Sequence, residues 1–101
     1  MTTGSNEYDL YEQDGEFVLS VEMPGFQRED IDIGWNDGRL TIAAKTEKQH
    51  RDQPRTYRRT FRIRAPIQSD EIQAKYENGI LDIYLPTSPE TTEKGTSIPV
   101  Q

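Results

Sequence analysis

The stretch IQAKYENGILDIYL, residues 72–85, contains two short strand patterns and the turn between them. Apolar and polar residues alternate on both sides of Asn78-Gly79, as they do in strands that bury one face. Asn-Gly accepts the positive φ angles of a type I′ turn, which is a common two-residue connection of β-hairpins. The stretch therefore predicts an antiparallel hairpin that pairs residues 72–76 with residues 80–85.

The same combination recurs along the rest of the chain. Asp14-Gly15 separates residues 8–13 from 16–22, and Asp37-Gly38 separates residues 31–35 from 39–45. A further alternating segment covers residues 57–63, which brings the number of candidate strands to seven. Short strands at regular spacing with Gly and Pro turns are typical of an all-β sandwich or barrel. No helix longer than a single turn at Ser69-Asp70-Glu71-Ile72 is expected.

Length and composition limit the function classes. A chain of 101 residues fits one domain, and with 32% apolar against 30% charged residues its core must be thin. The chain has no cysteine, no apolar run long enough to span a bilayer and no signal-like segment near Met1, so we expect a soluble, cytoplasmic protein without membrane contact.

Charge argues against nucleic acid as a partner. The net charge of −6 repels phosphate backbones, so binding would need a strong local basic patch. There are two candidate patches, one of Arg51 and Arg55 and one of Arg58, Arg59, Arg62 and Arg64. The second group lies on a strand pattern without interleaved aromatic residues for base stacking, so a structural or partner-facing role is favoured.

Catalytic and metal-binding motifs are missing from the sequence. The single histidine lies in His50-Arg51-Asp52, the tripeptide of a kinase catalytic loop, but the Gly-rich loop and partner lysine of kinases are absent. Residues 46–55 are nearly all polar and are interpreted as a solvated loop. The acidic residues do not follow calcium-loop spacing. We therefore expect no catalytic residue, no cofactor, no metal and no enzymatic activity.

Arg59 shares strand parity with the apolar residues Tyr57, Phe61 and Ile63. A guanidinium on that face needs a carboxylate partner or an interface, because burying it unpaired costs several kcal/mol. The alternative is a strand edge at which the side chain reaches solvent along its own stem. An interface is the favoured interpretation.

Two β-branched residues flank a proline near the C-terminus, in Ile98-Pro99-Val100. Residues 87–97 before them are polar and read as a flexible tail. Side chains i and i+2 of an extended segment point the same way, and Pro99 favours extended backbone. A frayed end is the alternative, but the motif suits docking into a groove at a sheet edge by strand addition.

Four stretches carry a family likeness. They are Val21-Glu22-Met23-Pro24-Gly25-Phe26 with Glu29-Asp30-Ile31; Asp37-Gly38-Arg39-Leu40-Thr41-Ile42; Ala74-Lys75-Tyr76-Glu77-Asn78-Gly79-Ile80-Leu81; and Ile98-Pro99-Val100. Over most of its length the chain resembles the α-crystallin domain of small heat-shock proteins, of prokaryotic or archaeal type. The third stretch is the most specific of the four.

The resemblance implies an immunoglobulin-like β-sandwich of about seven strands in two antiparallel sheets. It divides the chain into a short N-terminal remnant (residues 1–7), an α-crystallin domain (8–87) and a C-terminal extension (88–101) with Ile98-Pro99-Val100 as its anchor. The anchor would dock between residues 31–35 and 72–76. The groove candidates are Ile33, Trp35, Ile72 and Ala74, for which ordinary core packing is the alternative. Arg59 matches a family arginine at the dimer contact.

The implied activity is that of an ATP-independent holdase in the stress response. It would bind partly unfolded client proteins and form homodimers and larger assemblies. The rival readings are a monomeric co-chaperone adaptor of the related sandwich type and, more weakly, a ligand-binding sandwich. Three features depart from the family pattern: only residues 1–7 precede the first strand, residues 45–57 are shorter than a loop that often carries a swapped strand, and Arg64 replaces a proline that here occurs at Pro66.

Overall fold

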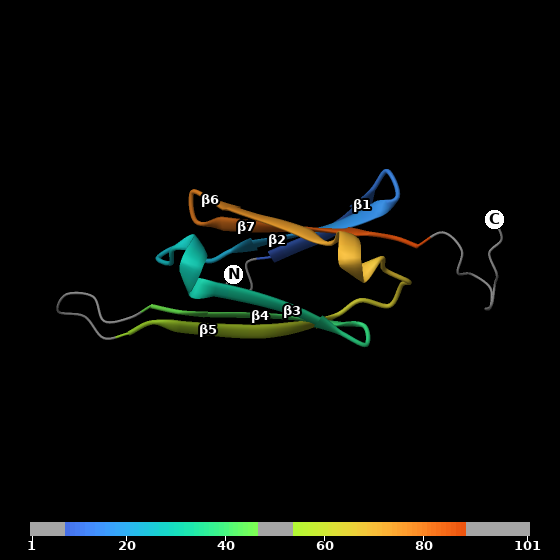
Figure 1. Ribbon diagram of the computed structural model, residues 1–101. Coiled ribbons are helices and arrows are strands. Elements are labelled where there is room, and N and C mark those ends of the chain that lie inside the picture. Colours follow the sequence, from blue (N-terminus) through green and yellow to red (C-terminus); the bar gives the residue numbers. More distant parts are fainter. Residues whose placement is uncertain (1–7, 47–53, 89–101) are drawn as a thin grey trace, which may run out of the picture.

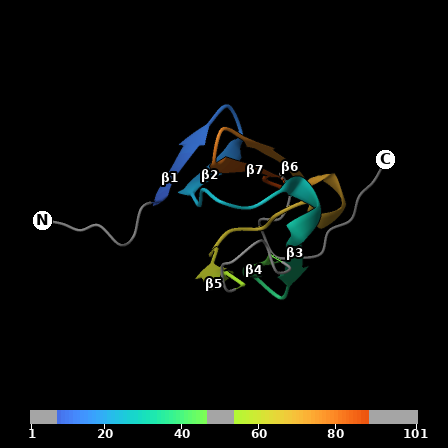
Figure 2. The same ribbon diagram turned by 90° about the vertical axis from the view of Figure 1, so that its left-hand side faces the viewer.

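The computed structural model describes residues 8–46 and 54–88, which form seven strands in two antiparallel sheets. The strands are β1 (Tyr8–Gln13), β2 (Glu16–Glu22), β3 (Ile31–Asn36), β4 (Arg39–Lys45), β5 (Thr56–Arg62), β6 (Gln73–Glu77) and β7 (Ile80–Pro86). One sheet has the order β1-β2-β7-β6 and the other the order β3-β4-β5. The two sheets lie face to face as the layers of a sandwich (Figures 1 and 2). The predicted all-β sandwich of seven strands is confirmed.

Three turns set the register of the hairpins. Asp14, Asp37 and Asn78 have φ angles of 48°, 52° and 51°, and each is followed by a glycine with a positive φ angle. Both central residues of each turn are thus left-handed, as type I′ turns require. The β6–β7 hairpin pairs Glu77 with Ile80, and the predicted strand boundaries differ from the observed ones by about one residue.

The core consists of inward-facing side chains from both sheets. Its fully buried members include Leu19, Leu40, Ile42, Ile83 and Leu85, each 0% exposed. They come from the three central strands β2, β4 and β7, which have a strand neighbour on both sides. The edge strands β1, β3 and β6 are more exposed, so the openings between the two sheets are flanked by less buried residues.

Two single turns of 3₁₀ helix interrupt the strands. The turn η2 (Ser69–Glu71) lies where a single helical turn is predicted. The turn η1 (Arg28–Asp30) was not predicted, because its signal is a local exchange of hydrogen bonds between Gln27 and Asp30 rather than a periodic pattern. It leads directly into β3 and so helps to position that strand.

Candidate assembly and binding surfaces

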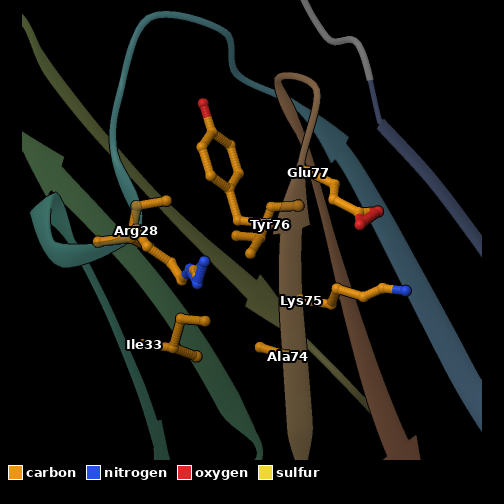
Figure 3. Close-up of a pocket in the computed structure, with 8 residues that line it drawn as sticks. Arg28, Ile33, Ala74, Lys75, Tyr76 and Glu77 are labelled. Carbon is orange, nitrogen blue, oxygen red and sulfur yellow. The ribbon is translucent and has the colours of Figure 1, made fainter.

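A groove of about 430 Å³ lies between β3 of one sheet and β6 of the other (Figure 3). Ile31 and Ile33 line it from β3, and Ala74 lines it from β6, with the buried Leu81 also at its surface. Charged and polar side chains complete the lining; they are Arg28, Lys75, Tyr76 and Glu77. The groove is therefore apolar between the two strands and polar around them.

Both strands that border this groove are sheet edges. Within the described residues β3 pairs with β4 alone, and β6 pairs with β7 alone. The outer backbone edge of each strand can therefore accept another extended segment, which is the requirement for strand addition. Ala74 is exposed, and its small side chain leaves the space above the groove open.

Tyr76 fixes the end of the groove to the turn before β3. Its hydroxyl donates a hydrogen bond to the carbonyl of Met23 (2.8 Å) and accepts one from the backbone N–H of Phe26 (3.3 Å). The N–H of Met23 also donates to the carbonyl of Gly79 (2.8 Å). The Pro24-Gly25 turn is thus tied to the β6–β7 hairpin, so the two walls of the groove are held by shared contacts.

The four predicted groove residues separate into two pairs. Ile33 and Ala74 line the groove, one from each strand. Trp35 and Ile72 are partly buried and lie outside the lining of the groove, and like Ile33 they pack against the core cluster. Sequence periodicity could not separate the two pairs, because residues of equal parity on β3 point into the same space at different depths.

The opposite opening of the sandwich, between β1 and β5, is closed by aromatic side chains. The rings of Tyr8 and Phe61 meet edge to face, with their centroids 5.1 Å apart. The guanidinium carbon of Arg59 lies 5.1 Å from the Tyr8 centroid and 5.0 Å from the Phe61 centroid. Among the described residues no carboxylate forms an ion pair with Arg59, so the two rings are its observed partners, a solution the sequence analysis did not consider.

The edge strand β1 exposes apolar side chains that the sequence analysis did not single out. Tyr8, Leu10 and Tyr11 are 45%, 41% and 45% exposed. Tyr8 and Leu10 have inward parity, but β1 has no strand beyond it in its sheet, which leaves them open to solvent. The weak alternation of this segment was the only sequence signal for them.

The predicted anchor Ile98-Pro99-Val100 lies outside the described residues, as does His50. The start of the C-terminal segment is held in place, because Thr87 donates two hydrogen bonds to the carbonyl of Gly15 (3.0 and 2.9 Å). The N–H of Ser88 donates to the carbonyl of Pro66 (2.8 Å). The end of β7 is therefore tied to the β1–β2 turn and to Pro66.

Residues 8–46 and 54–88 contain no group of three or more metal-ligating side chains that could hold a metal ion. In the same part of the chain no helix is long and apolar enough to cross a membrane.

A protein-family model described as the Hsp20/alpha crystallin family matches residues 9–101. The chain belongs to this family. A heat shock protein, HSP.16.4 of Streptococcus thermophilus, is 35% identical over 92% of this chain and 72% of its own length. Small heat shock protein C2 of Rickettsia felis is 34% identical over 77% of this chain and 57% of its own length.

Solved structures of Hsp20/alpha-crystallin proteins have the same fold. Heat shock protein 16.0 of Schizosaccharomyces pombe superposes with a TM-score of 0.74 at 26% identity, covering 98% of this chain and 86% of that chain. The resemblance to small heat-shock proteins is therefore confirmed. Membership of the family supports a chaperone role, and its members are chaperones rather than enzymes.

Proposed function

We propose that this protein is an ATP-independent holdase, which binds partly unfolded proteins and prevents their aggregation. The observation that carries the proposal is the open groove between β3 and β6, an apolar surface bordered by two strand edges. Exposed apolar surface and free edges bind unfolded chain by burial and backbone hydrogen bonds, and neither interaction consumes a nucleotide. The cytoplasmic location expected from the sequence stays a prediction.

The same groove would accept the anchor Ile98-Pro99-Val100 of another copy. In an extended segment the side chains of Ile98 and Val100 are roughly 7 Å apart on one face, the spacing that Ile31 and Ile33 have on β3. Pro99 lacks an N–H group, which an added edge strand tolerates when that position faces solvent. Docked anchors and bound clients would compete for one surface.

The length of the tail is compatible with docking on a neighbour. Ile98 follows Ser88 by ten positions along the chain, and ten extended steps span about 35 Å. Because Thr87 and Ser88 are hydrogen-bonded to the domain, the tail starts from the end of β7, whereas Glu77 at the groove lies at the other end of the β6–β7 pair.

The dimer contact would use the β1 and β5 side. Arg59 lies there on the edge strand β5, and Tyr8 and Leu10 add exposed apolar surface on the edge strand β1. A monomeric adaptor is the alternative, and sedimentation analysis separates the two: an adaptor sediments at the mass of one chain at micromolar concentration. If the contact includes Arg59, the dimer of the Arg59→Ala variant should dissociate at a higher protein concentration than the wild-type dimer does.

Light scattering from a heated client protein tests the activity. When one copy of this chain is present for each client molecule, light scattering by the client should be suppressed to the same extent with and without ATP. A serum albumin at equal mass controls for crowding. Unchanged client scattering at stoichiometric amounts would refute the holdase proposal for this chain.

The anchor is tested by the double substitution Ile98→Gly and Val100→Gly. The mass distribution should shift toward the dimer, because both apolar side chains that fill the groove are removed. Thr91→Gly with Thr92→Gly, in the same tail, is the matched control and should keep the wild-type distribution. An unchanged distribution of the Ile98 and Val100 variant would show that the tail is not an anchor.

A further inference from the structure

The outward face of the three-stranded sheet is locally basic in an acidic protein. Side chains whose parity is opposite to the buried Leu40 and Ile42 point away from the core. The charged members of this basic face are Arg39, Lys45, Arg58 and Arg62, with Asp32 as the single carboxylate. All five are exposed. The face therefore has a positive net charge, whereas the chain as a whole has a net charge of −6.

Two cations of the basic face oppose each other directly. Arg39 on β4 and Arg62 on β5 are cross-strand partners, and like charges in that position destabilise a sheet. Within the described residues neither guanidinium has a carboxylate at ion-pair distance. The fold gains nothing from this arrangement, whereas an external carboxylate placed between the two guanidinium groups would be held by both.

The centre of the basic face is flat. Gly34, Thr41 and Thr60 form one cross-strand row between the row of Arg58 and the row of Arg39 and Arg62. A Cβ added to Gly34 would meet no atom within 4 Å, and its backbone is not left-handed. Neither packing nor φ therefore requires glycine there, and glycine weakens a strand. Close approach by another molecule is one physical reason for glycine at this position.

The outward face of the four-stranded sheet has the complementary features. Its carboxylates are Asp9, Glu16, Glu22, Glu77 and Asp82, and Lys75 is its single cation. The central row of this acidic face is Tyr11, Val18 and Tyr84, with Asp9 on one side of the row and Glu16 on the other. The two rings of this row, Tyr11 and Tyr84 on either side of the buried Val18, thus lie between carboxylates, as the row of Gly34 lies between cations.

A hollow on the acidic face has the chemistry of an arginine site. It measures about 570 Å³ and is lined by Glu16, Glu71 and the ring of Tyr84, with Lys75 at its surface. A guanidinium binds carboxylates through paired hydrogen bonds and stacks on aromatic rings, so this combination suits Arg better than Lys. Three of the four cations of the basic face are arginines.

We propose that the basic face of one copy docks on the acidic face of a second copy. The tyrosine row would lie over Gly34, Thr41 and Thr60, and the flanking carboxylates would meet the flanking cations. Nucleic acid is a poorer occupant, because the basic face has no aromatic side chain on which bases could stack. The contact does not use the tail, and it shares only Lys75 and Glu77 with the lining of the groove of the proposed function.

The area of the basic face predicts a weak contact. Three strands about 4.8 Å apart and seven residues long cover roughly 300 Å², well below the roughly 800 Å² per partner of stable complexes. Exposed charge pairs are screened by salt, with a Debye length of about 10 Å at 0.1 M. The contact should therefore form at low ionic strength or inside an assembly already held together by other contacts. It joins two different faces, so it links copies head to tail.

Charge reversal tests the proposal by sedimentation at about 0.02 M and about 0.5 M salt, where screening is weak and strong. The wild type should associate more at low salt. Arg39→Glu with Arg58→Glu, or Asp9→Lys with Glu16→Lys, should each abolish that difference. The variant with all four substitutions keeps the net charge of −6 and should recover the stronger association at low salt. A one-to-one mixture of the two double variants should also associate.

Two outcomes overturn the proposal. One is an acidic-face variant that keeps the low-salt association of the wild type, which would assign the basic face to a different anion. The other is a wild type whose mass distribution is independent of salt. Repeating the series with Ile98→Gly and Val100→Gly in the same chains separates this contact from the proposed tail contact, since its salt dependence should persist there.

Gly34→Val tests the flat centre without disturbing the fold. The new side chain points into open space and favours strand conformation, so the melting temperature should stay the same or rise. The low-salt association constant should fall by about fivefold, because the two methyl groups would fill the space that Gly34 leaves open beside Thr41, where a facing side chain could come closest. Wild-type association of a folded Gly34→Val protein would contradict close approach at this row.

Discussion

The sandwich has two openings between its sheets, and the sequence builds them differently. On the β1 and β5 side, Tyr8, Arg59 and Phe61 fill the space with two rings and a guanidinium. On the β3 and β6 side, Ala74 occupies one of the two inward positions on the edge strand β6, next to Tyr76, and a groove of about 430 Å³ remains. Both openings follow the same alternation of parity. Side-chain size at an edge position therefore decides whether an opening is closed or available for binding.

Of the substitutions at the two openings, Phe61→Ala should have the largest effect on the free energy of unfolding. Phe61 is 9% exposed, contacts Tyr8 and lies under Arg59, so its removal leaves a cavity and takes one ring from each partner. The free energy of unfolding should fall by about 3 kcal/mol. Urea denaturation measures the loss. Thr60→Ala, an exposed neighbour on the other face of β5, should change stability by less than about 0.5 kcal/mol.

Tyr8→Ala should have an intermediate effect, since it removes the outer ring of the closed side. Tyr8 is 45% exposed, and its edge contact with Phe61 and stacking under Arg59 should account for about 1 kcal/mol. Tyr8→Phe keeps the ring and should match the wild type. A double-mutant cycle with Arg59→Ala should show coupling of about 0.5 kcal/mol. Strict additivity would mean that the guanidinium gains nothing from this ring.

Ala74→Tyr should have the smallest effect on stability and a clear one on assembly. It places on β6 the residue type that closes the other side, at an exposed position, so unfolding should change by less than about 0.5 kcal/mol. Because the ring would fill the groove, we expect the mass distribution to shift toward the dimer, as for the tail variant. Gln73→Tyr, one residue earlier and facing outward, should leave assembly unchanged at about 0.5 M salt, where the proposed contact of the acidic face is screened. Wild-type assembly of the Ala74→Tyr protein would place the docking surface elsewhere.

The candidate site was predictable from the sequence in part. Ile33 and Ala74 were named from resemblance and parity, and both line the groove. Trp35 and Ile72 were named on the same grounds and lie outside the lining of the groove, so their role in docking stays a prediction; parity gives the side of a strand and not the position along it. Arg28 and Tyr76 were missed, because a 3₁₀ turn and a hydrogen bond across 53 residues leave no periodic signal.

The sequence by itself determined the strands, the hairpins and the family. These depend on neighbours along the chain: alternation at i and i+2, and the left-handed φ angles that Asp-Gly and Asn-Gly accept at Asn78 and its equivalents. Only the tertiary structure decided which edges lie side by side. The stacking of Arg59 on Tyr8, the groove between β3 and β6 and the opposite charges of the two outer faces all depend on how the sheets are ordered and layered. Such contacts join residues far apart in sequence, and a local sequence pattern does not show which distant residues lie close together in space.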